Sequence, residues 1–263
     1  MTYESNSLSQ ASKCAYGTCI KDHFVQSSKD RLAYLLEDQR RMAKAKNYFA
    51  WQGRLVLPEI GRRVIEVGCG TGNFTGMLLD REAVIALDVQ PACIERLLER
   101  YPGQSNLEAY AFDANSPDFT ALARFRPDSC VCLNVLEHVE DDHATVRAMA
   151  SILVSGGTVA LLLPALPALT GPIDRNLGHF RRYRAADVHV LAETAGLRIR
   201  KMHFVNAIGM FGWWADARLL RLGAIPQWQI AAFDKLVAPV LSRVEAIAPP
   251  PFGQSLFAVL EKP

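Results

Sequence analysis

The chain lacks the composition of a nucleic-acid-binding or membrane-spanning protein. Its 29 basic and 27 acidic residues leave a net charge of +2 over 263 residues, which gives no general attraction to a polyanion. Its most apolar segments, 155–169 and 204–225, are broken by glycine and proline or by charged residues, so neither reads as a bilayer span. We expect no nucleic-acid partner and no stable membrane insertion.

The cysteines are irregularly placed. The six cysteines have no framework spacing, and Cys130 and Cys132 lie on one predicted buried strand, which is typical of reduced thiols and not of a disulfide scaffold. Cys14 and Cys19 have no second pair or nearby histidines, so no zinc site is expected. The first residues also lack a basic segment followed by an apolar one, so we expect a cytoplasmic protein.

One stretch, Val64–Thr75, organises the rest of the sequence. A predicted buried strand, Arg62–Val67, runs into a glycine-dense turn and then into a predicted helix, Asn73–Arg81. A strand, glycine turn and helix in this order bring bare backbone amides up to a ligand. The stretch therefore predicts a cofactor site.

The spacing of the glycines narrows the kind of cofactor. Gly68, Gly70 and Gly72 form G-x-G-x-G and not the G-x-G-x-x-G of dinucleotide sites. Glu66 lies two residues before the first glycine, inside an otherwise apolar strand. Both features argue against a nicotinamide-dependent oxidoreductase and favour a cofactor with a cationic, amino-acid-like end.

The pattern E-x-G-x-G-x-G resembles motif I of the class I S-adenosylmethionine (SAM) dependent methyltransferases. Four further landmarks follow in that family's order, and with motif I they cover roughly Gly61 to Pro164. They are a strand Ala83–Asp88 with a terminal acid, a strand Leu107–Ala114 containing Asp113, a strand with an N-V-L-E-H motif at Asp128–His138, and a turn Ser155–Gly157 before a strand Thr158–Pro164.

The resemblance implies a fold and a set of cofactor contacts. The fold would be an α/β, Rossmann-like, doubly wound sheet of seven mostly parallel strands with an antiparallel edge strand, plus a helical lid and insertion. The cofactor would be SAM, with an acid at the ribose and another at the adenine. The expected cofactor residues are Tyr48, Glu66, Gly68, Gly70, Gly72, Asp88, Val89, Asp113, Ala114 and Asn134.

The chain divides into five predicted segments around this core. Strands alternate with helical patterns at 92–101, 119–124, 142–153 and 185–194, which predicts a mostly parallel sheet covered on both faces. An irregular stretch of 20 residues, 165–184, precedes the last of these helices. The segments are a flexible tail (1–28), a helical lid (29–57), the SAM-binding core (58–205), a helical cap or homodimer surface of two or three helices (206–253) and a final edge strand (254–263).

Two histidines are the candidate catalytic residues. Methyl transfer needs mainly alignment of the partners, and a general base is required only where the nucleophile must lose a proton. His138 follows the fourth strand and titrates near neutral pH, although it could instead shape its loop. His179 lies in the loop expected to cover the acceptor.

A catalytic metal is not expected. The region around His138 resembles the E-x-x-E-H pattern with which small-RNA 2′-O-methyltransferases and some quinone-pathway O-methyltransferases hold a divalent ion. Asn134 stands at the first position of that pattern. Losing this anionic ligand leaves a poorer site for a hard cation.

Basic and aromatic residues after the fifth strand are the candidate acceptor contacts. Arg175, Arg181 and Arg182 could clamp an anionic group, or one of them could pair with Asp174 in a structural turn. Trp213 belongs to the aromatic-rich insertion, which favours a partly apolar acceptor.

The sequence therefore predicts a SAM-dependent methyltransferase acting on a small molecule, such as a partly apolar metabolite or natural-product intermediate. It is expected to work by positioning, without a metal and with a possible histidine base. The alternatives are a nucleic-acid or protein methyltransferase and a non-catalytic protein of the same fold.

Overall fold

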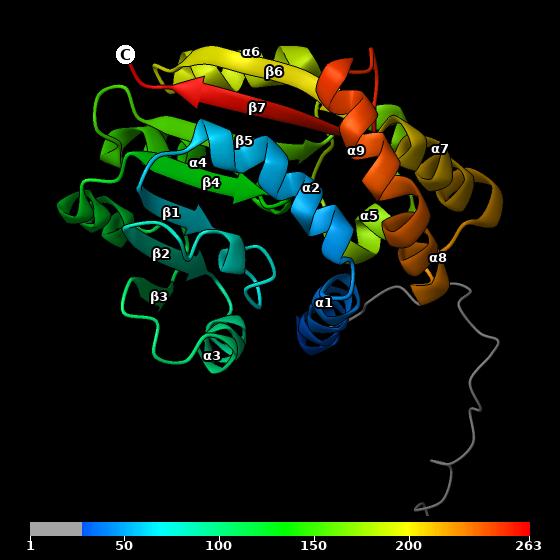
Figure 1. The fold of residues 1–263 in the computed structure, drawn as a ribbon, viewed down its shortest axis with the longest axis horizontal. Helices are drawn as coiled ribbons and strands as arrows, with labels where there is room; N and C mark the ends of the chain where they lie inside the picture. Colours follow the sequence, from blue (N-terminus) through cyan, green and yellow to red (C-terminus); the bar gives the residue numbers. More distant parts are fainter. Residues whose placement is uncertain (1–27) are drawn as a thin grey trace, which may run out of the picture.

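The computed structural model describes residues 28–263 and is built on one seven-stranded sheet (Figure 1). The strand order is β3-β2-β1-β4-β5-β7-β6, and the first five pair in parallel. β7 is antiparallel to both of its neighbours. The strands are β1 (Arg63–Val67), β2 (Ala83–Asp88), β3 (Leu107–Ala111), β4 (Ser129–Leu133), β5 (Thr158–Pro164), β6 (Arg198–Val205) and β7 (Ser255–Glu261).

This architecture confirms the predicted fold class. The order reverses at β1 and β4, and in such sheets ligands bind beyond the carboxyl ends of the strands at that point. One detail is corrected. The last strand was expected at the edge, but β7 is inserted between β5 and β6, so β6 is the edge strand. β7 is apolar and almost wholly buried, whereas all residues of β6 except Val205 are exposed or only partly buried, which is the arrangement that burial favours.

Helices cover both faces of the sheet (Figure 1). α4 and α6 pack on one face, and α2, α3 and α9 supply buried side chains to the other. None of the helices within residues 28–263 is long and apolar enough to cross a bilayer. The helices are α1 (Ser28–Met42), α2 (Lys46–Val56), α3 (Pro91–Arg100), α4 (Asp142–Ile152), α5 (Pro172–Leu177), α6 (Ala185–Thr194), α7 (Ala207–Ala215), α8 (Gln227–Ala232) and α9 (Ala238–Ile247).

The regions before β1 and after β6 were predicted to be helical. The first consists of α1 and α2, separated at 43–45. The second, which we call the cap (206–253), contains α7, α8 and α9 with π-helical segments at Asp216–Leu220 and Phe233–Val237. The predicted tail and its two cysteines lie outside the described residues, except Ser28, which begins α1.

Two local predictions are wrong. The predicted helix 73–81 is a series of turns around a single 3₁₀ turn, Thr75–Met77. The Thr75 hydroxyl is bonded to Glu66, and Gly76 is a poor helix former. The stretch 165–184 is not wholly irregular, because it contains α5. This short helix begins at Pro172, and the Asp174 carboxylate accepts from Gly171 N at 2.8 Å, which satisfies an otherwise unpaired amide.

Candidate cofactor and acceptor site

The turn after β1 has a geometry that favours glycine. Gly68, Gly70 and Gly72 have φ of 75°, 53° and 80°, in the left-handed region. The amides of Gly68 and Cys69 both donate to Leu87 O at 2.8 Å, which ties the turn to β2. A Cβ atom on Gly68 would lie 2.2 Å from Val135 Cγ2. The turn is therefore a cradle of bare backbone at the end of β1.

Asp88, at the end of β2, closes the far side of this turn. Its carboxylate accepts from Gly70 N at 2.9 Å and from Gln90 N at 2.8 Å. Burial raises the pKa of Asp88, and the two amide hydrogen bonds oppose that rise. The acid is thus part of the structure of the turn as well as a candidate ligand contact.

Glu66 is a buried acid without a positive partner among the described residues. It is 4% exposed, and the Thr75 hydroxyl donates to its Oε2 at 2.6 Å. Burial raises the pKa of Glu66 to about 8, although the hydrogen bond from Thr75 opposes the shift. A cationic group of a ligand would relieve this cost, so the site fits a cofactor with an ammonium group.

α1 lies against the glycine turn from outside the sheet. Asn73 Nδ2 donates to both the backbone and the side-chain oxygen of Gln39 at 2.9 Å. A Cβ atom on Gly70 would lie 2.8 Å from the Gln39 side chain. The Tyr34 hydroxyl of the same helix donates to Gly223 O of the cap at 2.8 Å. α1 therefore joins the cofactor turn to the cap.

A single cavity of about 650 Å³ extends from the glycine turn to the cap. Glu66, Gly68 and Asn73 line it at one end, and cap residues such as Trp213 and Phe233 line it at the other. Its volume is in the range of small-molecule sites. Part of the predicted cofactor set thus shares one space with the predicted acceptor residues Arg182 and Trp213. The cofactor residues that line it are Tyr48, Glu66, Gly68 and Asn134, whereas Gly70, Gly72 and Asp88 do not line it.

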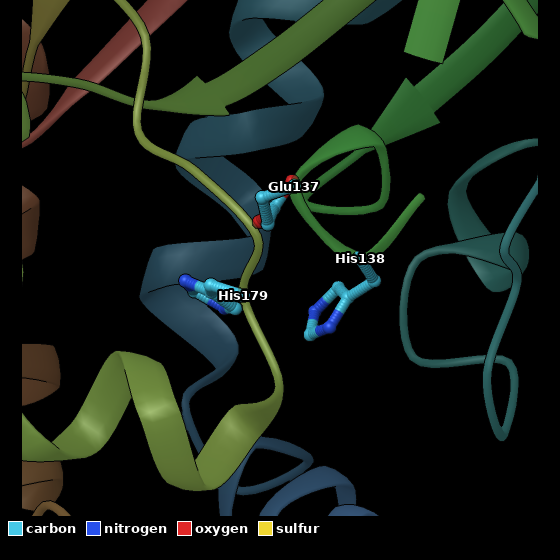
Figure 2. A group of neighbouring side chains, drawn as sticks. All are labelled: Glu137, His138 and His179. Atoms are coloured by element: carbon cyan, nitrogen blue, oxygen red, sulfur yellow. The ribbon is translucent and has the colours of Figure 1, made fainter. Parts of the chain in front are cut away.

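Three ionisable side chains converge on this cavity from two loops (Figure 2). Glu137 and His138 belong to the 3₁₀ turn after β4, and His179 follows α5. One ligand atom from each lies within 4.8 Å of the other two. The two imidazole rings meet edge to face with centroids 4.6 Å apart. The structure therefore brings together both predicted catalytic histidines and adds an acid.

The Asp174 carboxylate contacts the His179 ring at Nδ1. Its Oδ1 lies 3.0 Å from His179 Nδ1 and accepts from Arg182 Nε at 2.8 Å. Burial alone would raise the pKa of Asp174, but the bond to His179 and the charge of Arg182 outweigh it and hold that pKa below its ordinary value. Because an ionised carboxylate only accepts, Nδ1 carries a proton, and in the neutral form of the ring Nε2 is the acceptor.

Glu137 has an unsatisfied buried oxygen. The side chain is 1% exposed, and its Oε2 has no hydrogen-bond partner among the described residues. Burial raises the pKa of Glu137 to about 7, against the opposing charge of His179. Phe180 N donates to Glu137 O at 2.7 Å, so the two loops are also joined through the backbone. An unpaired polar atom in a cavity marks a place for a ligand group.

A carboxylate and two imidazoles are also a residue set that can hold a divalent cation. The sequence-based expectation of no metal considered Asn134 in the local pattern and did not include His179, which is distant in the chain. Asn134 has φ of 55° and lines the cavity beside this cluster. Metal independence therefore stays a prediction.

The other predicted cofactor residues fall into two groups. Tyr48 lines the cavity, and its amide donates to Asp234 Oδ1 at 2.9 Å. Val89, Asp113 and Ala114 do not line it. Asp113 lies beyond the end of β3, is exposed, and accepts from Asn115 N at 2.8 Å, whereas Val89 is exposed and Ala114 is buried.

The three arginines are not gathered into a clamp. Arg182 lines the cavity but is paired with Asp174 and donates to Ala165 O at 3.1 Å. Arg181 forms an ion pair with Asp142 at 2.8 Å, and Arg175 is exposed. Neither of these two lines the cavity. The alternative in which an arginine pairs with Asp174 is the arrangement found.

Trp213 lines the cavity and is buried. The guanidinium of Arg182 lies 4.6 Å from the centre of its ring. Trp213 Nε1 has no hydrogen-bond partner among the described residues. The indole therefore offers both apolar area and an unused donor.

Sequence reasoning missed Glu137, Asp38 and Gln39 as cavity residues. Asp38 lies between Leu35 and Met42 on one stripe of α1. Leu35, Asp38 and Met42 all line the cavity. A polar residue on an apolar helical stripe is the signal that could have found it. Glu137 was read only as part of a motif, because nothing local shows that its carboxylate is buried.

A glycine cradle, a buried acid and a cavity lie together at the switch point of the mostly parallel sheet, which is where Rossmann-like folds bind their ligands. A family model described as a methyltransferase domain matches residues 29–202. The match covers well over half of the chain, so the chain belongs to this family.

Similar proteins carry methyltransferase names. A ubiquinone biosynthesis O-methyltransferase of Xanthomonas campestris is 33% identical over 109 residues, covering 41% of this chain and 44% of that protein. One of Ralstonia nicotianae is 31% identical over 157 residues, covering 53% of this chain and 64% of that one. A malonyl-[acyl-carrier protein] O-methyltransferase of a Paenibacillus species is 28% identical, covering 54% and 53% respectively. The chain thus spans about half the length of these relatives.

Solved structures show the same fold. The N-methyltransferase NodS of Bradyrhizobium japonicum, in complex with S-adenosyl-L-homocysteine, aligns with a TM-score of 0.56 at 16% identity, covering 88% of this chain and 96% of that one. The geranyl diphosphate C-methyltransferase of Streptomyces coelicolor aligns with a TM-score of 0.55 at 12% identity, covering 81% and 77%. At these identities the likeness concerns the fold alone.

Proposed function

We propose that this protein binds SAM at the glycine turn and methylates a small, partly apolar acceptor held in the same cavity under the cap. One observation carries the proposal. The cavity joins the glycine cradle to an apolar cap, and it is lined by two buried polar atoms that have no hydrogen-bond partner within residues 28–263, Glu137 Oε2 and Trp213 Nε1. Such atoms are unfavourable unless a ligand satisfies them.

At the cofactor end, the chain supplies shape and charge. The cradle admits a ligand close to the backbone, and Glu66 offers a buried carboxylate to an ammonium group. The cofactor would supply an electrophilic methyl group on a sulfonium. The residues around it align the two partners and exclude water, which accounts for much of the rate in such transfers.

At the acceptor end, we propose that an oxygen is methylated. The support is that the relatives named above are O-methyltransferases. A hydroxyl must lose its proton, so a base is useful. His179 is held by Asp174 with Nε2 as an acceptor, and His138 lies beside it. We assign these two histidines to proton removal and Glu137 to holding a polar group of the acceptor.

The first experiment is transfer of labelled methyl from SAM into a cell extract, with and without a chelator. Label in a small-molecule fraction, insensitive to chelator, is the expected result. If a chelator abolished transfer and a divalent cation restored it, the histidine base would be rejected. The three side chains Glu137, His138 and His179 would then be assigned to holding that cation. Label only in macromolecules would favour a nucleic-acid or protein methyltransferase. SAM binding without transfer would favour a non-catalytic protein.

Variants then test the base with the labelled acceptor. We expect His179→Ala and His138→Ala to lower kcat by about 100-fold or more while SAM affinity stays within about twofold, because general bases contribute roughly 10²–10⁴. His143→Ala is the matched control, since His143 contacts Thr194 away from the cavity. Unchanged kcat in both active-site variants would remove the histidines from the mechanism.

A further inference from the structure

The outer surface of the cap is unusually apolar. Among the described residues, most exposed large apolar side chains belong to 206–253, and only Val89, Leu98, Phe180 and Val190 lie elsewhere. Trp228 of the cap is 72% exposed. Exposed apolar residues scattered singly are normal, but a concentration in one segment marks an interaction surface.

One part of this surface is a stripe along α9 and the turn before it. Val240, Val244 and Ile247 are spaced four and three residues apart on one face of the helix, and Leu236 lies one turn earlier. Their exposed fractions are 61%, 54%, 87% and 73%. This periodicity leaves a continuous apolar stripe without a partner in the described chain.

The stripe continues to the mouth of the cavity. Leu236 of the stripe lines the cavity and is exposed, as are Ile208 and Phe211 of α7. The Phe211 ring meets that of Phe252, beyond the end of α9, with centroids 6.4 Å apart. We call these seven residues the apolar face: Ile208, Phe211, Leu236, Val240, Val244, Ile247 and Phe252. The cavity therefore opens onto the apolar face.

The exposed charges of the cap are all positive. Arg218, Arg221, Lys235 and Arg243 are exposed, and none of them forms an ion pair with another residue of the described part of the chain. Arg243 lies between Val240 and Val244 in the sequence of α9. Cationic side chains beside an exposed apolar stripe are typical of helices that lie in a membrane interface.

The acids of the cap point inward and are already used. Asp216, Asp234 and Glu245 are each at most 5% exposed. Asp216 accepts from Gln229, Asp234 from Tyr48 N, and Glu245 from the amides of Asn206 and Ala207. The cap therefore presents apolar and cationic groups outward and has no carboxylate on that surface.

We propose that the apolar face docks on the surface of an anionic lipid bilayer. Cationic side chains attract anionic headgroups, and the stripe can enter the boundary with the acyl chains without any spanning helix. A second copy of the chain fits less well. A two-fold interface is self-complementary and would bring the same arginines together with no carboxylate to pair them. As a consequence that rests on the proposed function, the acceptor enters the cavity from the lipid phase.

The test is sedimentation of the protein with vesicles, in the absence of SAM and acceptor. Vesicles of phosphatidylcholine alone are compared with vesicles containing about one third phosphatidylglycerol. We expect binding to the anionic vesicles that weakens with salt. Lys235→Gln with Arg243→Gln should weaken it about 25-fold, at roughly fivefold for each basic residue. Val244→Ser with Ile247→Ser should weaken it about tenfold or more, by loss of apolar insertion.

The matched control is Leu98→Ser with Val190→Ser, which removes two exposed apolar side chains outside the cap. This control should bind vesicles like the unaltered protein. Absence of binding to anionic vesicles overturns the proposal. A dimer in light scattering that Val244→Ser with Ile247→Ser dissociates, without vesicle binding, would assign the apolar face to a second copy.

The outcome is separable from that of the proposed function. Val244 and Ile247 do not line the cavity, so their double variant should keep SAM affinity and turnover of an acceptor dissolved in detergent. Loss of vesicle binding with intact turnover in detergent supports docking. Vesicle binding by a protein that transfers no methyl group would leave docking intact and reject the enzymatic proposal.

Discussion

The two ends of the cavity differ in how the chain builds them. The cofactor end comes from neighbouring residues, with Glu66 and the three glycines within seven positions of one another. The acceptor end comes from Glu137, His179 and Trp213, on three separate segments. A contiguous site has a sequence motif that can be recognised, whereas a dispersed site does not. This difference explains why the cofactor is easier to name than the acceptor.

The largest effect should come from filling the glycine cradle. Gly68→Ala would place a Cβ atom 2.2 Å from Val135 at a φ of 75°. We expect a loss of about 2–4 kcal/mol in the free energy of unfolding from strain and overpacking, and SAM affinity lower by more than about 100-fold in calorimetry. Gly103→Ala is the control, because Gly103 has φ of 72° and nothing within 4 Å. Equal SAM affinities in the two variants would contradict a close approach of ligand to Gly68.

The second prediction concerns pH and Glu66. Its pKa is about 8 in the folded, cofactor-free protein, above the ordinary value, so burial favours the protonated form. The contribution of Glu66 to the free energy of unfolding should therefore be largest below about pH 4.5 and fall as the pH rises towards 8. The difference attributable to Glu66 is on the order of a few kcal/mol.

Urea unfolding of wild type and Glu66→Gln at several pH values measures this difference. In Glu66→Gln, the free energy of unfolding should no longer show the fall with rising pH that is due to Glu66. The control Glu193→Gln, at an exposed position, should show the same fall as the wild type. SAM binding near pH 7 should release a proton in the wild type and not in Glu66→Gln, which calorimetry in buffers of different ionisation enthalpy detects. Identical slopes for wild type and Glu66→Gln would show that Glu66 ionises normally.

A smaller effect is expected at Asp88. Asp88→Ala removes the acceptor of the Gly70 and Gln90 amides and a candidate partner of the ribose. The free energy of SAM binding should become less favourable by about 1–3 kcal/mol, the cost of leaving paired polar groups unsatisfied. Calorimetric titration with SAM gives the value. Unchanged affinity would mean that the ribose lies elsewhere.

The smallest effect should come from the acceptor end. Ile225→Ala trims a partly buried side chain that lines the cavity in the cap. KM for the acceptor should rise by about tenfold, because about 1–2 kcal/mol of apolar contact is lost, and SAM affinity should stay the same. Ile199→Ala, a partly buried position away from the cavity, is the control. A parallel loss of SAM affinity in Ile225→Ala would show that the two ends are not separate.

The successes and errors of the sequence predictions follow the range of the interactions involved. Strands β1, β2 and β5 were placed within one residue because buried parallel strands are continuous apolar runs. The predicted helix at 73–81 was wrong because Thr75 bonds to Glu66 across the turn, a contact that helical periodicity does not register. The arginines after β5 were grouped by proximity in sequence, yet Arg181 and Arg182 pair with different acids on different segments.

By itself, the sequence determined the family, the sheet and the glycine turn at which we propose the cofactor binds, since the glycine spacing and the buried acid are local requirements of one backbone turn. Only the tertiary structure decided that His179 joins Glu137 and His138, that Asp174 holds it, and that the cap turns its acids inward. These features depend on which distant segments meet and on which side of each helix is buried. Such contacts are set by packing, and no short stretch of residues encodes them.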